Sequence, residues 1–255
     1  HKEYRRQRQM CIRDRGSGGG RGHDDRFGEF GSGAAVGCRG NRLAAGHESK
    51  WNKTMKPVNV IFDTDPGIDD AMALLLLHAL PSTNVQAIST VFGNASIEDC
   101  TRNALYICER FSLPYPVYKG AGVTFSGLAE TAYPDFVHGA DGLGDVGFPM
   151  PTRRAEPQSS VDYMIETLRA ASEPIEVLAV GRMTNLAEAL KQAPDIAPLI
   201  DRIVMMGGAV AVPGNVTEWA EANIYGDPEA AAFVFDSGVP VLMVGLDATL
   251  EHRMK

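Results

Sequence analysis

Four aspartates gather in one short stretch of this chain: Asp63, Asp65, Asp69 and Asp70. The apolar run before them, residues 58–62, predicts a buried strand, and the Pro-Gly pair between them predicts a turn. The residues that follow have the composition of the first turns of a helix. Like charges crowded at a strand-to-helix turn repel one another unless a cation, a helix N-terminus or a polyol substrate offsets them. The stretch therefore predicts a binding site.

Polar residues also follow the other predicted strands. They are Asn94, Thr184 within residues 181–185, the group Asn215, Glu221 and Asn223, and finally Asp247. In an open parallel sheet, ligands bind beyond the carboxyl ends of the strands. We therefore expect these side chains to converge with the aspartates at one edge of a sheet, a pattern that is more informative than any single residue.

The elements that would hold these residues alternate along the chain from residue 56. We expect strands over residues 58–62, 85–91, 116–118, 175–180, 202–206 and 240–244, and helices over 69–80, 96–111, 161–171, 186–192 and 228–236. Strands that alternate with helices imply right-handed crossovers and a doubly wound α/β fold, with a mostly parallel sheet and helices on both faces. Residues 119–158 are rich in Gly and Pro and predict a long functional loop.

Charge divides the chain into two parts. Residues 1–55 hold 12 Lys/Arg and 6 Asp/Glu, whereas residues 56–255 hold 12 and 26. The first part also contains 11 of the 27 glycines and shows no apolar periodicity, so we interpret it as a disordered head that need not be native sequence. We interpret residues 56–255 as one α/β domain. Its acidic balance disfavours nucleic acid as a partner.

The cysteines and the hydropathy bear on location. Cys100 and Cys108 lie eight residues apart in a helical pattern, about 12 Å at ~1.5 Å per residue, which is too far for a disulfide. Free thiols are typical of a reducing compartment, so we expect a cytoplasmic protein. No apolar run reaches the roughly 18 residues of a membrane span, and we expect no membrane partner.

Four segments together resemble the inosine-uridine-preferring nucleoside hydrolases. They are Asp63-Thr-Asp-Pro-Gly-Ile-Asp-Asp70, Met205-Met-Gly-Gly208, Asn215 with Glu221-Ala-Asn223, and Asp227-Pro-Glu-Ala-Ala231. The resemblance covers about residues 56–255. It implies an α/β enzyme that uses a bound calcium ion to hydrolyse the N-glycosidic bond of ribonucleosides to ribose and a free base. It also implies a homodimer or homotetramer.

The resemblance assigns the metal and the base chemistry to the aspartate stretch. Asp65 and Asp70 match calcium-binding aspartates, and Asp65 also matches the general base that deprotonates the attacking water. The backbone carbonyl of Thr184 would be a further calcium ligand. Asp63 would support these residues from behind. Calcium prefers six to eight oxygen ligands, which a carboxylate-rich turn with a carbonyl begins to supply.

The resemblance assigns the substrate to a second set of residues. Those that match ribose- or pocket-binding positions are Asp69, Asn94, Asn215, Glu221 and Asn223, and His138 resembles a histidine near the base pocket. Each also has a structural explanation: an asparagine favours turns, for example, and charged residues solvate loops. We interpret Asp227, directly before Pro228, as a helix N-cap.

One departure from the family pattern leaves two alternatives open. The family has a His-Asp pair near its C-terminus, in which the Asp completes the calcium site and the His lies near the leaving base. Here only Asp247 and His252 lie in that region. Asp247 resembles an earlier family segment, so we interpret the domain as incomplete at its C-terminus. A non-catalytic calcium- or nucleoside-binding remnant is one alternative. The other is a haloacid dehalogenase-like phosphohydrolase, since Asp63-Thr-Asp65 follows a strand, although Pro66-Gly67 does not suit that class.

Overall fold

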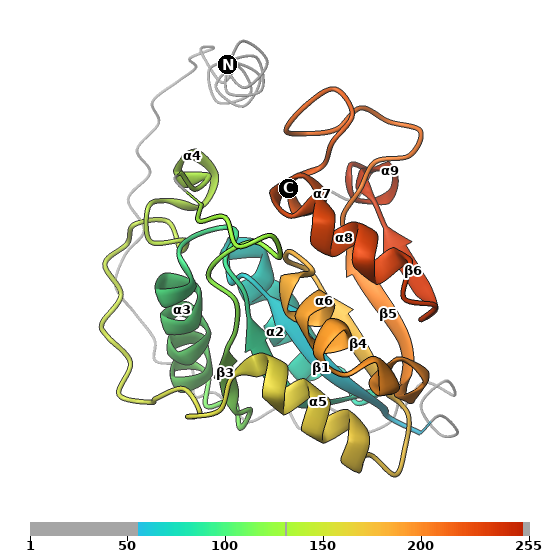
Figure 1. Cartoon of the computed structure of the whole chain (residues 1–255). Helices are drawn as coiled ribbons and strands as arrows, with labels where there is room; N and C mark the ends of the chain where they lie inside the picture. Colours follow the sequence, from blue (N-terminus) through green and yellow to red (C-terminus); the bar gives the residue numbers. More distant parts are fainter. Residues whose placement is uncertain (1–55, 131, 252–255) are drawn as a thin grey trace, which may run out of the picture. The chain divides into compact units, whose positions relative to one another are not determined.

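A parallel six-stranded sheet organises the computed structural model, which describes residues 56–130 and 132–251 (Figure 1). The strands are β1 (Val58–Thr64), β2 (Thr83–Thr90), β3 (Val117–Lys119), β4 (Ile175–Ala179), β5 (Ile200–Met206) and β6 (Val241–Val244). Their order is β3-β2-β1-β4-β5-β6, and every neighbouring pair is parallel. The prediction about residues 1–55 lies outside the described residues.

Helices join the strands and cover both faces of the sheet. They are α2 (Ile68–Ala79), α3 (Ile97–Arg110), α4 (Asp135–His138), α5 (Ser160–Ala170), α6 (Thr184–Gln192), the 3₁₀ helix η2 (Pro194–Leu199), α7 (Ala222–Gly226), α8 (Pro228–Phe235) and α9 (Leu246–Thr249). Ile61 packs in a core with α5, α6 and α8, whereas Phe62 packs in a second core with α2 and α3. Because successive residues of a strand face opposite sides, these two residues mark the two faces. The predicted doubly wound α/β fold is confirmed.

β1 is longer than the apolar pattern predicts. The apolar run ends at Phe62, but the strand continues through Thr64, since Asp63 and Thr64 pair in register with Ser89 and Thr90 of β2. Both polar residues are buried. The polar stretch therefore begins inside the sheet, where neighbouring strands supply its hydrogen bonds.

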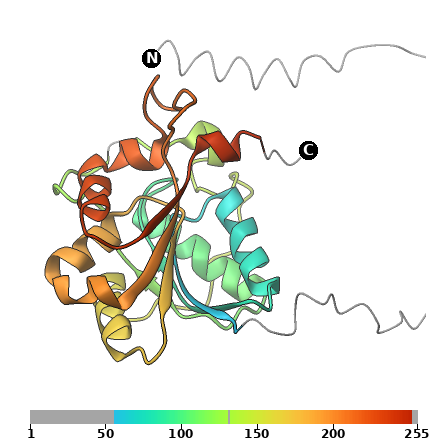
Figure 2. The same ribbon diagram turned by 90° about the vertical axis from the view of Figure 1, so that its right-hand side faces the viewer.

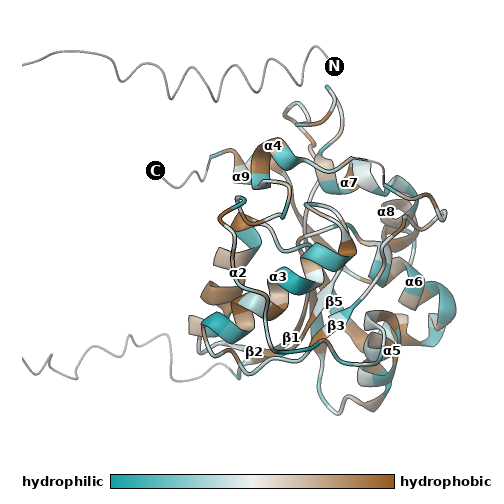
Figure 3. Cartoon of the chain, turned by 90° about the vertical axis from the view of Figure 1, so that its left-hand side faces the viewer, coloured by the Kyte–Doolittle hydropathy of each residue, from teal (hydrophilic) through white to brown (hydrophobic). Residues whose placement is uncertain are grey.

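The segments that follow the strands gather at one end of the sheet. Figures 1 and 3 show α4, α7 and α9 at this end, and Figure 2 shows that the segment between β5 and α7 projects beyond it. Residues 120–158 are largely irregular, as predicted, but they contain the short helix α4, which the sequence pattern did not indicate. No helix of the described residues is long and apolar enough to cross a membrane.

α2 is apolar on both sides (Figure 3). Leu74 is buried in the core, while Met72 and Leu76 on the other side are 48% and 60% exposed.

α3 buries Cys100 and Cys108 as free thiols, which confirms that these two residues form no disulfide.

Candidate active site

The carboxylate of Asp65 lies between two glycines that follow neighbouring strands. Gly93 comes after β2 and Gly181 after β4. A Cβ on Gly93 would overlap Asp65 Oδ2, and a Cβ on Gly181 would lie 2.6 Å from Asp65 Oδ1. Asp65 is only 2% exposed. The missing side chains of the two glycines thus create the space that the carboxylate fills.

Asn94 joins the two aspartates that the sequence assigns to the metal. Its backbone N–H donates to Asp65 Oδ2 at 2.9 Å. Its Nδ2 donates to the Asp65 carbonyl at 3.0 Å and to Asp70 Oδ2 at 3.1 Å. The amide group of Asn94 therefore holds the aspartate turn together, in addition to any part it plays in binding substrate.

Asp70 contacts the backbone at the start of α2 and also accepts the hydrogen bond from Asn94. Its Oδ2 accepts the backbone N–H of Gly67 at 2.9 Å, which completes a capping arrangement at the start of α2. Its Oδ1 accepts the hydroxyl of Thr64 at 2.7 Å. The N-terminal end of the helix and the neighbouring strand thus share one buried carboxylate.

The raised pKa values of Asp65 and Asp70 favour a cation beside them. Burial raises the pKa of Asp65 well above its usual value, and the negative charge of Asp70 adds to this rise. Burial, followed by the charge of Asp69, raises the pKa of Asp70 to about 6. Two buried carboxyl groups that resist ionisation would both ionise more readily beside a cation.

The side chain of Asp63 contacts a different set of residues, behind the turn. Its Oδ1 accepts hydrogen bonds from Ser89 Oγ and from Asn185 Nδ2. Within residues 56–130 and 132–251, its Oδ2 is buried without a hydrogen-bond partner. Burial raises the pKa of Asp63 to about 6. Asp63 therefore belongs to the support of the site.

Sequence reasoning missed Asn185, which is fully buried beside Asp63. Its Nδ2 donates to Asp63 Oδ1 at 2.8 Å and to the Thr90 carbonyl at 2.9 Å, and its Oδ1 accepts the N–H of Ala121 at 2.7 Å. It connects α6 with β1, β2 and the segment after β3. The only signal in the sequence was its place beside Thr184 at a strand end.

Sequence reasoning also missed Arg182, which is 8% exposed. Its guanidinium forms an ion pair with Glu130 at 2.8 Å and lies over the ring of Phe92, 4.4 Å from the ring centre. Its positive charge lowers the pKa of Asp65, against the larger effects of burial and of Asp70. A buried arginine beside a carboxylate pair offsets part of the negative charge.

Thr184 is the first residue of α6, and its hydroxyl contacts Asp227. Thr184 Oγ1 donates to Asp227 Oδ2 at 2.6 Å, and the N–H of Phe125 donates to the same oxygen at 2.7 Å. Asp227 Oδ1 accepts the N–H of Ala230, so Asp227 caps α8 as predicted. The hydroxyl of Thr184 thus connects α6 with the start of α8, and the predicted role of its backbone carbonyl as a ligand stays a prediction.

His138 contacts the start of α2. Its Nδ1 accepts the N–H of Ile68 at 3.3 Å and lies 3.9 Å from Asp69 Oδ1. Burial lowers the pKa of His138, while the charge of Asp69 opposes that shift. Since Nδ1 accepts a hydrogen bond, the neutral ring carries its proton on Nε2. The carboxylate of Asp69 is 80% exposed, so it lies at the open side of the group.

A second group of predicted residues lies beyond β4 and β5. Glu221 Oε2 accepts the N–H groups of Gly208 and Asn223, both at 2.9 Å. Asn223 Nδ2 donates to the carbonyls of Val180 at 2.8 Å and Met206 at 3.0 Å, at the ends of β4 and β5. Asn215 Oδ1 accepts the N–H of Ala222 at 2.9 Å. The structure therefore anchors these three side chains to backbone at the predicted edge.

The predicted residues thus form two groups beyond the carboxyl ends of the strands. The first contains Asp65, Asp69, Asp70, Asn94 and His138, and the second contains Asn215, Glu221 and Asn223. Among residues 56–130 and 132–251, no group of three or more His, Cys, Asp or Glu side chains is arranged to hold a metal ion. The carboxylate donors of the first group are hard oxygens, which suit calcium or magnesium better than zinc.

Comparison with known proteins gives consistent matches. The family model for inosine-uridine preferring nucleoside hydrolases matches residues 60–255. Uridine nucleosidase 1 of Arabidopsis thaliana is 43% identical over 201 residues, which are 78% of this chain and 59% of that protein. The pyrimidine-specific ribonucleoside hydrolase RihB of Escherichia coli is 40% identical, over 76% of this chain and 61% of its own length.

Solved structures agree with these matches. A purine-preferring ribonucleoside hydrolase from Gardnerella vaginalis has a TM-score of 0.75 and 40% identity, and covers 77% of this chain and 63% of its own. The plant nucleoside hydrolase PpNRh1 has a TM-score of 0.72 and 41% identity, over 75% and 60%. This chain spans about three-fifths of the length of the proteins that it matches.

Proposed function

The chain belongs to the inosine-uridine preferring nucleoside hydrolase family, and we propose that it hydrolyses the N-glycosidic bond of ribonucleosides to ribose and a free base. The observation that carries this proposal is the placement of Asp65, whose buried carboxylate lies between Gly93 and Gly181 beside Asp70 and Asn94. Family membership argues against the haloacid dehalogenase alternative.

We assign the general base to Asp65. Its carboxylate would accept a proton from the attacking water, and burial makes it a stronger base than an exposed aspartate. The reaction passes through an oxocarbenium-like transition state, which the buried carboxylates would stabilise by their negative charge. Asn94 would hold Asp65 in one orientation through its two hydrogen bonds.

We propose that calcium binds to the carboxylates of Asp65 and Asp70 and to the backbone carbonyl of Thr184. Hard oxygen donors and the unfavourable ionisation of the two buried carboxyl groups support a hard divalent cation here. When bound, the ion would supply positive charge that favours ionised carboxylates and orients the attacking water. Because calcium takes six to eight oxygens, water, substrate hydroxyls or further protein oxygens would complete the set.

We propose that the ribose lies between the two groups of polar residues. Glu221 uses Oε2 for backbone N–H groups, and we assign its Oε1 to a ribose hydroxyl. Asn223 uses Nδ2 for backbone carbonyls, and we assign its Oδ1 to a second hydroxyl. Asn215 and Asp69 would hold the sugar from its two sides, and the Nε2–H of His138 would face the base. Fixed contacts of this kind align the sugar with the attacking water.

Binding without turnover is the second candidate function. It is favoured by the described residues, among which no group of three or more His, Cys, Asp or Glu side chains is arranged to hold a metal ion. Catalysis needs the ion and the leaving base to be held as well as the sugar. A nucleoside would then bind with measurable affinity but release no ribose.

Two further properties are part of the proposal. The buried free thiols Cys100 and Cys108 support a reducing compartment such as the cytoplasm. The exposed apolar side chains of α2, among them Met72 and Leu76, support a homodimer or homotetramer. Size-exclusion chromatography with light scattering would measure the assembly, and a monomer at micromolar concentration would contradict this part.

The test is an assay of the purified chain with inosine and uridine, with calcium or with a calcium chelator. We expect reducing sugar to appear only with calcium, and Asp65→Asn to abolish it. Asp195→Asn is the matched control, because Asp195 lies on η2 in an exposed ion pair with Arg169. No ribose release from the unsubstituted protein would refute the hydrolase. Nucleoside binding by calorimetry without release would select the second candidate.

A further inference from the structure

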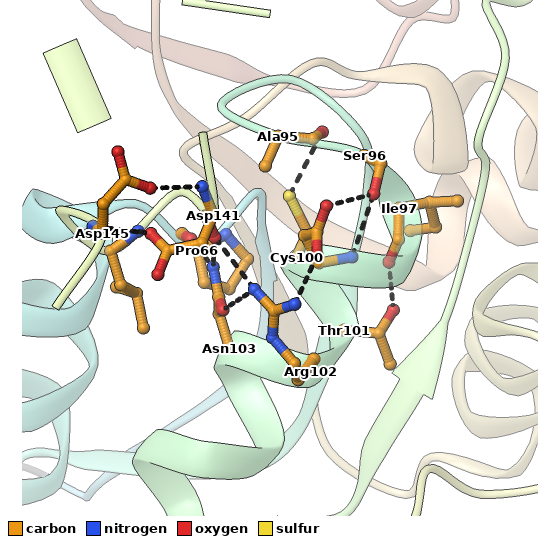
Figure 4. A network of polar contacts seen from close by, with 12 residues as sticks. Pro66, Ala95, Ser96, Ile97, Cys100, Thr101, Arg102, Asn103, Asp141 and Asp145 are labelled. Atoms are coloured by element: carbon orange, nitrogen blue, oxygen red, sulfur yellow. Dashed lines mark hydrogen bonds and ion pairs between the residues drawn. The ribbon is translucent and has the colours of Figure 1, made fainter. Parts of the chain in front are cut away.

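Asn103 of α3 contacts two separate segments of the candidate site through one amide group. Its Nδ2 donates to the Pro66 carbonyl at 3.2 Å and to the Asp141 carbonyl at 2.8 Å (Figure 4). Pro66 lies between Asp65 and the start of α2, and Asp141 lies in the loop that follows His138. Asn103 is 2% exposed, and its bond to Pro66 is buried, so water competes little for that bond.

The orientation of this amide is determined by its neighbour. Arg102 donates to Asn103 Oδ1 at 3.3 Å and to the Asp141 carbonyl at 3.2 Å, and it pairs with Asp99 on the preceding turn of α3 (Figure 4). Because Oδ1 receives a donor, the NH₂ group faces the two carbonyls. An aspartate at position 103 would instead place a carboxylate oxygen against two carbonyl oxygens.

The loop after α4 contacts α3 through Phe148, whose ring centre lies 4.5 Å from that of Tyr106. A cavity of about 220 Å³ lies between α3 and this loop, lined in part by Tyr106, Leu143 and Phe148. Val146 and Met150 of the same loop are 66% and 73% exposed. Polar contacts therefore add to this ring contact in holding the loop to α3, and Asn103 provides one of them from a buried side chain.

We propose that Asn103 is a positioning residue that holds the Pro66-Gly67 turn and the loop carrying His138 in one fixed relation. The proposal rests on the proposed hydrolase function for its consequence, because the turn carries Asp65, Asp69 and Asp70. The hydrogen bond between Ile68 and His138 and the 3.9 Å pair of His138 with Asp69 also link the two segments. Both of these contacts depend on His138, whereas Asn103 contacts the backbone of each segment directly.

The first measurement is hydrogen–deuterium exchange of the full chain, with Asn103→Asp compared with Arg102→Gln. Arg102→Gln is the comparison variant, because Arg102 contacts the Asp141 carbonyl and Asn103 Oδ1 but not the Pro66 carbonyl, and Asn103 itself stays in place. We expect Asn103→Asp to speed exchange about tenfold in residues 64–72 and 138–146, and Arg102→Gln to do so in 138–146 alone. Peptides from β1 and β4 serve as internal references for global unfolding.

The second measurement separates positioning from stability. With uridine, we expect Asn103→Asp to lower kcat by about 10²-fold with KM within about threefold, because misplaced groups lose alignment more than binding. If Asn103→Asp does not fold, Asn103→Ser replaces it, since the short hydroxyl cannot reach both carbonyls and at least one segment should exchange faster.

The proposal is overturned if the folded Asn103 variant exchanges like the unsubstituted protein in both segments. It is also overturned if exchange rises equally in β1 and β4, since Asn103 would then act on global stability alone. Failure of the unsubstituted protein to release ribose would refute the hydrolase function but would leave the exchange result to decide on Asn103.

Discussion

Gly181 lies so close to Asp65 that a methyl group on the glycine would sit 2.6 Å from the carboxylate oxygen Oδ1. Gly181 is the second residue after β4, and Asp65 is the first residue after β1. The contact therefore joins the ends of two neighbouring strands. The main chain just after β4 thus forms one wall of the space in which the proposed general base lies.

Gly181→Ala should therefore damage both stability and catalysis. The added methyl must displace the Asp65 carboxylate, and overpacking of this kind costs about 1–3 kcal/mol of unfolding free energy. Thermal or urea unfolding measures the loss. In an Asp65→Ala background the carboxylate is gone and Val91 Cγ1, at 3.0 Å, is the tight contact that remains, so Gly181→Ala should cost less. An equal cost in both backgrounds would show that the contact with Asp65 is not the cause.

The buried carboxyl of Asp63 should make stability fall as pH rises. Burial raises its pKa from 3.8 to about 6 in the folded state, so the folded protein holds this proton more tightly than the unfolded chain does. Its contribution is present below about pH 4 and is lost as pH rises through about 6, a change of up to about 3 kcal/mol.

Asp63→Asn is the variant that isolates this effect, because an asparagine does not titrate. We expect the unfolding free energy of the unsubstituted protein minus that of Asp63→Asn to decrease between pH 4 and pH 7 in urea titrations. A difference that stays constant over this range would mean that the pKa of Asp63 is not raised.

Calcium should stabilise the protein through Asp65 and Asp70. A ligand that binds only the folded state adds about 2.7 kcal/mol at a free concentration 100 times its dissociation constant. We expect calcium to raise the melting temperature of the unsubstituted protein but not that of Asp70→Asn. Asp162→Asn is a suitable control that should keep the effect, because Asp162 is exposed in the first turn of α5 and accepts a hydrogen bond from the N-cap residue Ser159.

Proton release should accompany the binding of calcium near pH 6. Burial and neighbouring charge raise the pKa of Asp65 and bring that of Asp70 to about 6, so part of the population holds a proton that the ion displaces. Calorimetry in buffers of different ionisation enthalpy counts these protons. We expect the number released to fall as pH rises toward 8, and no dependence on buffer at pH 6 would contradict the assignment of these two ligands.

Asp247 should anchor the segment that leads to Asn215. Its two carboxylate oxygens accept the N–H groups of Val210 at 2.9 Å and Ala211 at 2.7 Å, and these bonds lower the pKa of Asp247. Asp247→Asn replaces one acceptor by a donor, so the segment should become more mobile.

Trp219 reports on this segment, because its side chain is 80% exposed and only two tryptophans occur in the chain. With Trp51→Phe as background, we expect Asp247→Asn to lower the fluorescence anisotropy of Trp219 and to speed proteolysis between residues 209 and 220. Glu251→Gln, an exposed residue near the end of α9, should leave both unchanged. Equal anisotropy in the two variants would argue against the anchor.

The sequence by itself determined the fold class and predicted where the candidate site lies along the chain. Alternating apolar runs predicted the parallel sheet, and the run 58–62 followed by four aspartates predicted a strand-to-helix turn, which β1 and α2 confirm. These features depend on local spacing and on the rule that parallel strands end at one edge, so a linear pattern contains them.

Only the tertiary structure decided how the polar residues divide their contacts. Asp63 and Asp65 are two residues apart in a strand-to-turn segment, yet one contacts Asn185 and the other lies against Gly93 and Gly181. Asn185 and Asn103 carry no motif that predicts their contacts, because their partners lie 122 and 37 residues away. Burial, which raises the pKa of these carboxyl groups, arises when distant segments exclude water together, and no local pattern in the aspartate stretch contains that information.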